Sequence, residues 1–187
     1  MTSGTYAVVA YLNGHLADFV QNLRARLAPH EANIQAHLTL LSPRELESPP
    51  EKLHSALRRL CYDVRPVKAS LGQVESFVPV TNTVYLGVDG GAREVGELNQ
   101  RLNQYGFRAE DPWPYVPHVT LARLDDQGAA AEALRVAGHE WELYREAREF
   151  MIDKLTIVRE IAPGRWADLA AVPLPSAKPA STGVSSA

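Results

Sequence analysis

The chain has 187 residues, of which 45% are hydrophobic and 22% charged, and its formal net charge is −3 at pH 7. These values are typical of one globular domain or two closely packed lobes, and they provide no basic field to hold a long nucleic acid duplex, although a short anionic substrate remains compatible. The single cysteine, Cys61, excludes an internal disulfide and a cysteine-based zinc site, and it fits a reducing cytoplasm.

The first half of the chain alternates between strand and helix patterns. A β-prone apolar run at 6–12 is followed by an apolar stripe with helical spacing, which ends before Pro29. A second strand is expected over 36–41, where the Ser42-Pro43 pair stops it, and a second helix over 51–62. This half therefore predicts the order strand, helix, strand, helix.

The second half of the chain repeats this order after a hairpin-like pair of strands. Gly106 is placed to end the third helix, and Asp125 or Asp126 can cap the fourth. The expected ranges are 67–78 and 83–88 for the paired strands, 95–105 for the third helix, 117–123 for the next strand, up to about 136 for the fourth helix, and 150–161 for a further strand.

The repeated order predicts an α+β fold with two pseudo-symmetric lobes of largely antiparallel sheet, helices packed outside and a cleft between the lobes. We expect residues 1–172 to form this single bilobal domain and residues 173–187, rich in Pro, Ser and Ala, to be a disordered tail. The N-terminus has no signal-peptide pattern and no segment approaches the roughly 20 apolar residues that cross a bilayer. We therefore expect a cytoplasmic protein that does not bind membranes; no pattern indicates its oligomeric state.

Two short motifs recur in matching strand contexts, one in each half of the chain. The first runs from His37 to Leu40 as His-Leu-Thr-Leu, and the second runs from Pro117 to Arg123 as Pro-His-Val-Thr-Leu-Ala-Arg. Because side chains alternate faces along a strand, the histidine and threonine of each motif point the same way. One such motif is weak support for a site, but two copies favour a functional pair.

The four motif side chains, His37, Thr39, His118 and Thr120, provide two imidazoles that titrate near neutrality and two hydroxyl donors. In-line phosphoryl transfer needs a proton acceptor on one side of an anionic centre and a proton donor on the other. The threonines would hold the non-bridging oxygens. This scheme needs neither a metal nor another cofactor, and a histidine metal site would lack an evident third ligand.

These motifs resemble the signature of the two-histidine (2H) phosphoesterases, most closely the bacterial 2′-5′ RNA ligase and RNA 2′,3′-cyclic phosphodiesterase group, over about residues 6–166. The resemblance implies a bilobal fold, metal-free hydrolysis of 2′,3′-cyclic phosphate ends and, in some members, reversible joining of tRNA halves through a 2′-5′ bond. It implies that His37 and His118 are catalytic and that Thr39 and Thr120 hold phosphate. The chain departs from close relatives after the first motif, where Leu41-Ser42-Pro43 replaces the usual aromatic residue and glycine.

Arg123 also matches the bacterial group and is a candidate phosphate contact, although strand alternation places it opposite His118 unless the strand ends or bulges there. Phe77, Trp113 and Tyr115 could stack on a base or simply pack. The other histidines lack the motif context and are expected on the surface; they are His15, His30, His54 and His139.

The predicted activity is therefore metal-independent hydrolysis of 2′,3′-cyclic phosphate, with a small phosphodiester or an RNA terminus as the partner. Two alternatives stay open. The first is 2′-5′ RNA ligation of tRNA halves, and the second is a non-catalytic module that binds a nucleotide or an RNA end. The motifs do not distinguish hydrolysis from ligation, nor the acid histidine from the base histidine.

Overall fold

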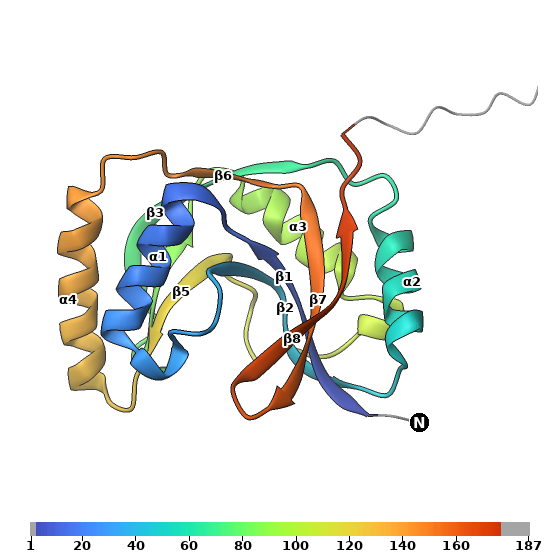
Figure 1. The fold of residues 1–187 in the computed structure, drawn as a ribbon, viewed down its shortest axis with the longest axis horizontal. Coiled ribbons are helices and arrows are strands. Elements are labelled where there is room, and N and C mark those ends of the chain that lie inside the picture. The colour runs from blue at the N-terminus through green and yellow to red at the C-terminus, as the bar shows by residue number, and fades with distance from the viewer. Residues whose placement is uncertain (1–2, 177–187) are drawn as a thin grey trace, which may run out of the picture.

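The computed structural model describes residues 3–176, which form two four-stranded antiparallel sheets and four α-helices (Figure 1). The first sheet has the order β2-β1-β7-β8, with β1 at Gly4–Tyr11, β2 at His37–Leu46, β7 at Lys154–Ala162 and β8 at Arg165–Pro173. The second sheet has the order β5-β4-β3-β6, with β3 at Val67–Ser76, β4 at Thr83–Val88, β5 at His118–Arg123 and β6 at Glu149–Ile152. The helices are α1 at Gly14–Leu27, α2 at Pro50–Leu60, α3 at Ala92–Leu102 and α4 at Gln127–Leu143, with short 3-10 turns η1 at Pro29–Glu31 and η2 at Tyr105–Phe107.

The two sheets are arranged alike. Each motif strand, β2 or β5, is the edge of its own sheet and pairs with the strand that precedes it in the repeated order, β1 or β4. The two edge strands lie against each other in the middle of the molecule. The predicted α+β fold with two pseudo-symmetric lobes is therefore confirmed.

Each lobe contributes a helix that covers the motif strand of the other lobe. Helix α1 packs on β5, and α3 packs on β2. At one end of the molecule α1 lies beside α4 (Figure 1), where Phe19 contacts the rings of Trp141 and Tyr144 at centroid distances of 5.4 and 4.7 Å. As a result, a single large apolar core runs through both lobes. None of the helices within residues 3–176 combines the length and apolar character that crossing a bilayer requires.

Both motif strands contain a β-bulge at the same motif position. In β2 the pairing with β1 moves from Thr39 directly to Leu41, and in β5 the pairing with β4 moves from Thr120 directly to Ala122. Each bulge inserts the leucine that follows the threonine. A bulge lets consecutive residues share a face, which explains why each inserted leucine and the residue after it are both fully buried.

The bulge in β2 is held by a side chain from the other lobe. Asn99 on α3 is buried and donates from Nδ2 to the carbonyl oxygen of Leu40, at 2.7 Å. Leu40 is the inserted residue, which has no paired residue on β1. A buried backbone carbonyl needs a partner, so this contact satisfies a group that the bulge removes from regular pairing.

The first motif strand is longer than expected. The sequence predicted a stop at Ser42-Pro43, but β2 continues to Leu46. Proline is tolerated because β2 is an edge strand and because a second register shift lies between Leu41 and Arg44. Proline at such a position removes no required ladder hydrogen bond.

Two helix ends also differ from the prediction. The third helix ends at Leu102 instead of about Tyr105, because Tyr105 has a positive φ of 50° and Gly106 lies inside η2. The fourth helix is capped by Asp126, whose carboxylate accepts from the Ala129 amide at 2.8 Å. It continues seven residues beyond position 136 to Leu143, since its buried stripe extends to Ala137 and Trp141.

The C-terminal strands were the least predictable part of the fold. The strand expected over 150–161 is two strands, β6 in the second sheet and β7 in the first, separated at Asp153. Strand β8 was not predicted, because most of its side chains are exposed and show no clear alternation. Pro173, where a disordered tail was expected to begin, ends β8, and Leu174 after it is buried. The rest of that prediction, over 177–187, lies outside the described residues.

Replacing Asn99 by alanine is expected to lower the free energy of unfolding by about 1–3 kcal/mol, because the Leu40 carbonyl then stays buried without a donor. The matched control is Gln100→Ala, at an exposed position of the same helix, which should change stability by less than about 0.5 kcal/mol. Urea unfolding followed by circular dichroism measures both. Equal stability of the two variants would show that the contact does not support the bulge.

Candidate functional site

The two motif histidines are held by the same kind of hydrogen bond. Nδ1 of His37 lies 2.7 Å from the carbonyl oxygen of Gln35, and Nδ1 of His118 lies 2.7 Å from the carbonyl oxygen of Val116. A carbonyl oxygen can only accept, so each Nδ1 must carry the proton. In the neutral ring Nε2 is then the unprotonated nitrogen, which is the form that a proton acceptor needs.

Cross-strand contacts tie the two motif strands together. The Tyr115 hydroxyl, just before β5, donates to the carbonyl oxygen of Thr39 at 2.7 Å. Arg24 on α1 donates to the carbonyl oxygens of Thr120 at 2.6 Å and Ile34 at 2.5 Å. These contacts fix the relative positions of the segment before His37 and the strand that carries His118.

Arg24 was not identified from the sequence. It lies within the apolar stripe of α1 and is almost fully buried, with a third contact of 3.3 Å to the carbonyl oxygen of Gln35. Burial lowers its pKa to about 10, an effect that the nearby charge of Glu31 opposes and that of Arg123 reinforces. At neutral pH Arg24 is therefore a buried cation beside both motif strands.

Each imidazole packs against aromatic rings of its own sheet. His37 meets the Tyr11 ring edge-on, with centroids 6.4 Å apart, whereas His118 meets both Phe77 and Tyr85 at 5.0 and 5.1 Å. Phe77 and Tyr85 also stack on each other at 4.1 Å. Phe77, a candidate for base stacking, therefore packs on the second motif histidine.

Each tyrosine beside a motif histidine donates to a carboxylate. Tyr11 donates to Asp168 Oδ1 at 2.5 Å, and Tyr85 donates to Glu75 Oε2 at 3.2 Å. Burial and the Glu75 carboxylate raise the pKa of Tyr85 to about 12, and burial and Asp168 raise the pKa of Tyr11 further. Both hydroxyls therefore stay protonated at neutral pH. Each lobe thus has a tyrosine and carboxylate pair beside its histidine, but the tyrosines differ in register: Tyr11 pairs across the strands with His37 itself, whereas Tyr85 pairs with Thr120.

Electrostatics keep both imidazoles neutral near pH 7. Burial, opposed by the Gln35 carbonyl and reinforced by the charges of Arg24, Arg123 and His118, lowers the pKa of His37 to about 4. Burial and the charge of Arg123 also lower the pKa of His118, against the effect of the Val116 carbonyl. The charge of His118 contributes because its strand, β5, lies against β2.

A cavity of about 790 Å³ opens beside the first motif and is lined by His37, Thr39 and Arg123, among others. His118 and Thr120 are not part of its wall; they lie on the adjacent edge strand, with Thr120 buried. The structure thus brings three of the five predicted site residues into one cavity and places the other two beside it.

The alternation argument against Arg123 does not hold in the structure. The bulge after Thr120 changes the alternation, and β5 ends at Arg123, so this side chain reaches the same cavity as His37. Its side chain is 56% exposed, and its guanidinium donates to Glu31 Oε1 at 2.6 Å, while its backbone amide donates to Glu31 Oε2 at 3.2 Å. Glu31 on η1 was not identified from the sequence, which gives no signal for this long-range pair.

Two aromatic residues before β5 differ in burial. Tyr115 is half-buried and bound to the Thr39 carbonyl, whereas Trp113 is 62% exposed. Cys61 is buried, and burial raises its pKa to about 11.

The histidines outside the motifs are mostly exposed. His15, His30 and His139 are exposed, and His54 is half-buried. Of these four, His30 lines the cavity beside His37. Within residues 3–176 no group of three or more His, Cys, Asp or Glu side chains is arranged to hold a metal ion.

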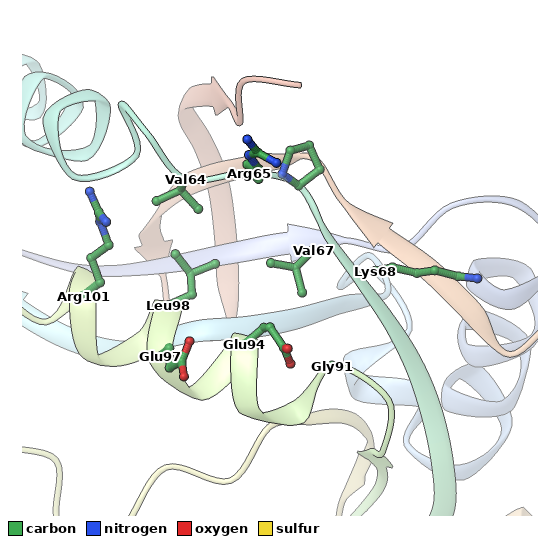
Figure 2. A pocket seen from close by; sticks show the side chains of 10 residues that line it. Val64, Arg65, Val67, Lys68, Gly91, Glu94, Glu97, Leu98 and Arg101 are labelled. Carbon is green, nitrogen blue, oxygen red and sulfur yellow. The ribbon is translucent and has the colours of Figure 1, made fainter. Parts of the chain in front are cut away.

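Figure 2 shows a second cavity, of about 690 Å³, between α3 and the segment that enters β3. It contains none of the motif residues. Four of its five charged side chains form ion pairs: Arg101 with Asp63, Lys68 with Glu149, and both Glu94 and Glu97 with Arg93. The fifth, Arg65, forms no ion pair within residues 3–176. Of these two cavities, the one beside His37 is therefore the one lined by predicted site residues.

Comparisons with known proteins show what the chain as a whole is similar to. A family model described as the 2′-5′ RNA ligase superfamily matches residues 13–163. A Bacillus pumilus protein named "Putative phosphoesterase" is 28% identical over 162 residues, covering 86% of this chain and 92% of its own, and one from Bacillus cytotoxicus is 31% identical over 130 residues, covering 68% and 74%. The crystal structure of Escherichia coli LigT in its apo form has a similar fold, with a TM-score of 0.64 and 19% identity over 93% of this chain and 99% of that one.

Arg24→Met is expected to lower the free energy of unfolding by about 2–4 kcal/mol, because the buried carbonyls of Ile34 and Thr120 lose a charged donor. Arg26→Ala is the matched control on the same helix: it breaks only an exposed ion pair with Glu140 and should leave stability nearly unchanged. Chemical unfolding of both variants tests this. A stable Arg24→Met protein would show that the motif strands do not depend on this cation.

Proposed function

Because the chain belongs to the 2′-5′ RNA ligase superfamily, we propose that it is a metal-independent phosphodiesterase that hydrolyses 2′,3′-cyclic phosphates at RNA ends or on nucleotides. The observation that carries the proposal is the pair of imidazoles on adjacent edge strands, each with Nδ1 bound to a carbonyl oxygen. Further support comes from relatives named as phosphoesterases and from LigT structures with bound 3′-AMP and phosphate.

In the proposed reaction His37 is the general base and His118 the general acid. The charges of Arg24 and Arg123 both disfavour a proton on His37, whereas of these two only Arg123 acts on His118. His37 is therefore the imidazole held more firmly in its neutral form. A phosphate anion that binds between the rings favours protonation of both, and His118, the ring held less firmly in its neutral form, takes the proton and becomes the acid.

The proposed reaction is an in-line displacement at phosphorus. Water attacks phosphorus while Nε2 of His37 takes a proton from it. The bond between phosphorus and one ribose oxygen breaks, and Nε2 of His118 gives its proton to that leaving oxygen. His37 then loses its proton to solvent and His118 regains one, which resets the site. Each proton transfer of this kind typically contributes about 10² to 10⁴ in rate.

The other predicted residues would stabilise the negative charge of the transition state. The hydroxyls of Thr39 and Thr120 would donate to the non-bridging oxygens, and Arg123 at the cavity wall would contact phosphate. Arg24 adds a buried positive charge beside both motif strands. Arg123 stays more than half exposed although it pairs with Glu31, so its guanidinium is accessible to an anionic substrate.

Ligation is the second candidate function, because the matching family is described as a 2′-5′ RNA ligase superfamily. The same acid and base would join a 2′,3′-cyclic phosphate end to a 5′-hydroxyl end if that hydroxyl, in place of water, attacked phosphorus and the 3′ oxygen left as the protonated leaving group. Incubating matched RNA halves with the protein and testing the product for a 2′-5′ junction separates ligation from hydrolysis.

His37→Ala and His118→Ala are each expected to lower kcat/KM for a 2′,3′-cyclic nucleotide by about 10² to 10⁴, measured with a metal chelator present. His139→Ala, at an exposed position on α4, is the matched control and should keep full activity. Unchanged activity in both motif variants would refute the proposed chemistry. Tight nucleotide binding without turnover by the unmodified protein would instead favour a binding module.

The dependence of kcat/KM on pH should be bell-shaped and displaced toward acid. The rate should rise with pH through about 4, because His37 must lose its proton to act as base, and it should fall above a pKa lower than 6.5, because the acid His118 then loses its proton. The falling limb of kcat should lie at higher pH, since bound phosphate raises the pKa of His118. Steady-state kinetics from about pH 3.5 to about pH 8 measure the pH profiles of kcat/KM and kcat. A flat profile would contradict the assignment.

A further inference from the structure

Two of the arginines within residues 3–176 are buried, Arg24 and Arg44, and the proposed reaction uses only the first of them. Arg24 reaches the entry to β2, where it donates to the carbonyl oxygens of Ile34 and Gln35. Arg44 lies further along β2, and only 4% of its side chain is exposed. Because a buried cation is destabilising unless it is paired, the partners of Arg44 indicate what the fold uses it to hold.

Most partners of Arg44 belong to the segment that follows α3. Its guanidinium donates to the carbonyl oxygen of Phe107 at 3.0 Å and to both carboxylate oxygens of Asp111, at 3.1 and 2.9 Å. It also donates to Asn103 Oδ1 at 2.8 Å, and the Asn103 amide group binds the backbone N–H and C=O of Ala109, each at 3.0 Å. The segment is therefore held against β2 at three successive points.

Ser42 completes this set of contacts. Its carbonyl oxygen accepts from Nε of Arg44 at 3.0 Å, and its hydroxyl accepts from Nη2 at 3.1 Å and donates to Asp111 Oδ1. Every nitrogen of the Arg44 guanidinium thus has an acceptor. The side chain of Asp111 is 30% exposed, so water reaches this ion pair only in part. Two neighbouring side chains of β2 consequently fix one carboxylate of the segment.

Residues 111–117, which connect Asp111 to β5, have little conformational freedom. Proline fixes its own φ and restricts the residue that precedes it, and three prolines lie in this stretch. Tyr115 is the one residue of the seven that neither is a proline nor precedes one, and its hydroxyl is bound to the carbonyl oxygen of Thr39 at 2.7 Å. The prolines are Pro112, Pro114 and Pro117. The stretch is therefore a stiff connection.

The far end of this connection holds the second motif histidine. The carbonyl oxygen of Val116 is the acceptor for Nδ1 of His118, and the carbonyl oxygen of Pro117 accepts from the Val88 amide at 3.0 Å. In a stiff connection, a displacement of Asp111 also displaces the Val116 carbonyl. A weaker contact at Nδ1 would let the proton move to Nε2, the nitrogen that exchanges protons with the substrate.

We propose that Asp111 is a positioning residue for His118. Held by Arg44 and Ser42, it fixes the Val116 carbonyl, which in turn fixes the tautomer and the direction of the His118 ring. The catalytic consequence rests on the proposed function, whereas the effect on the ring is measurable without turnover. The effect is also selective: the entry to β2 has its own donor in Arg24, so His37 does not depend on Asp111.

The first test observes both rings by heteronuclear NMR at neutral pH, with His37→Ala and His118→Ala used to assign their signals. In Asp111→Ala the chemical shifts of the two ring nitrogens of His118 should move toward each other, because the second tautomer becomes populated, while those of His37 stay unchanged. Glu110→Ala is the matched control at the exposed neighbouring position and should change neither ring.

The second test is kinetic, with a 2′,3′-cyclic nucleotide as substrate. Asp111→Ala should lower kcat about 10- to 100-fold and change KM less than about 3-fold, because a misplaced proton donor affects the transition state more than substrate binding. Asp111→Asn keeps an oxygen that accepts from Arg44 and should recover part of the loss. Glu110→Ala should keep full activity.

Unchanged His118 shifts in Asp111→Ala, equal changes in both rings, or a loss of activity mainly through KM would overturn the positioning role. If Asp111→Ala does not fold, Asp111→Asn provides the same comparison with smaller expected changes. Absence of turnover by the unmodified protein would refute the proposed function, whereas a selective change at His118 would still support the role of Asp111 in holding that ring.

Discussion

The hydrogen bond from each motif histidine to a carbonyl oxygen two residues upstream is the constraint on which the site depends. It assigns the proton to Nδ1 in His37 and in His118, so that Nε2 is the nitrogen available for exchange with substrate. Because the acceptors are backbone atoms at the entry to β2 and β5, the geometry of the rings is set by the path of the chain. Anything that holds the two strand entries in place therefore holds the catalytic geometry proposed for them.

Side chains that cross between the lobes provide that support. Arg24 from α1 reaches the carbonyl of Thr120 on β5, and Asn99 from α3 reaches the carbonyl of Leu40 on β2. Both acceptors lie at the bulges that follow the motif threonines, where regular strand pairing is interrupted. The bulges turn consecutive side chains into the core and bring Arg123 to the cavity, while the donors from the opposite lobe satisfy the backbone.

The motif strands, the first helices and the two-lobed α+β fold could be predicted because apolar periodicity and a repeated four-residue motif are local signals. The break at Asp153 could not, since apolar strand-forming residues lie on both sides of Asp153 and Lys154 and only the tertiary structure divides them between two sheets. Strand β8 has too few buried positions to show alternation. Arg24 was missed because a charged residue inside an apolar stripe normally marks its edge, and its acceptors are brought to it by folding.

If both imidazoles act on one phosphate, a crystal structure of the protein soaked with inorganic phosphate should show it. We expect one anion within hydrogen-bonding distance of Nε2 of His37 and Nε2 of His118, with the hydroxyls of Thr39 and Thr120 on its remaining oxygens. An anion that contacts only one of the two histidines, or that binds away from both while the motif strands keep their positions, would contradict it.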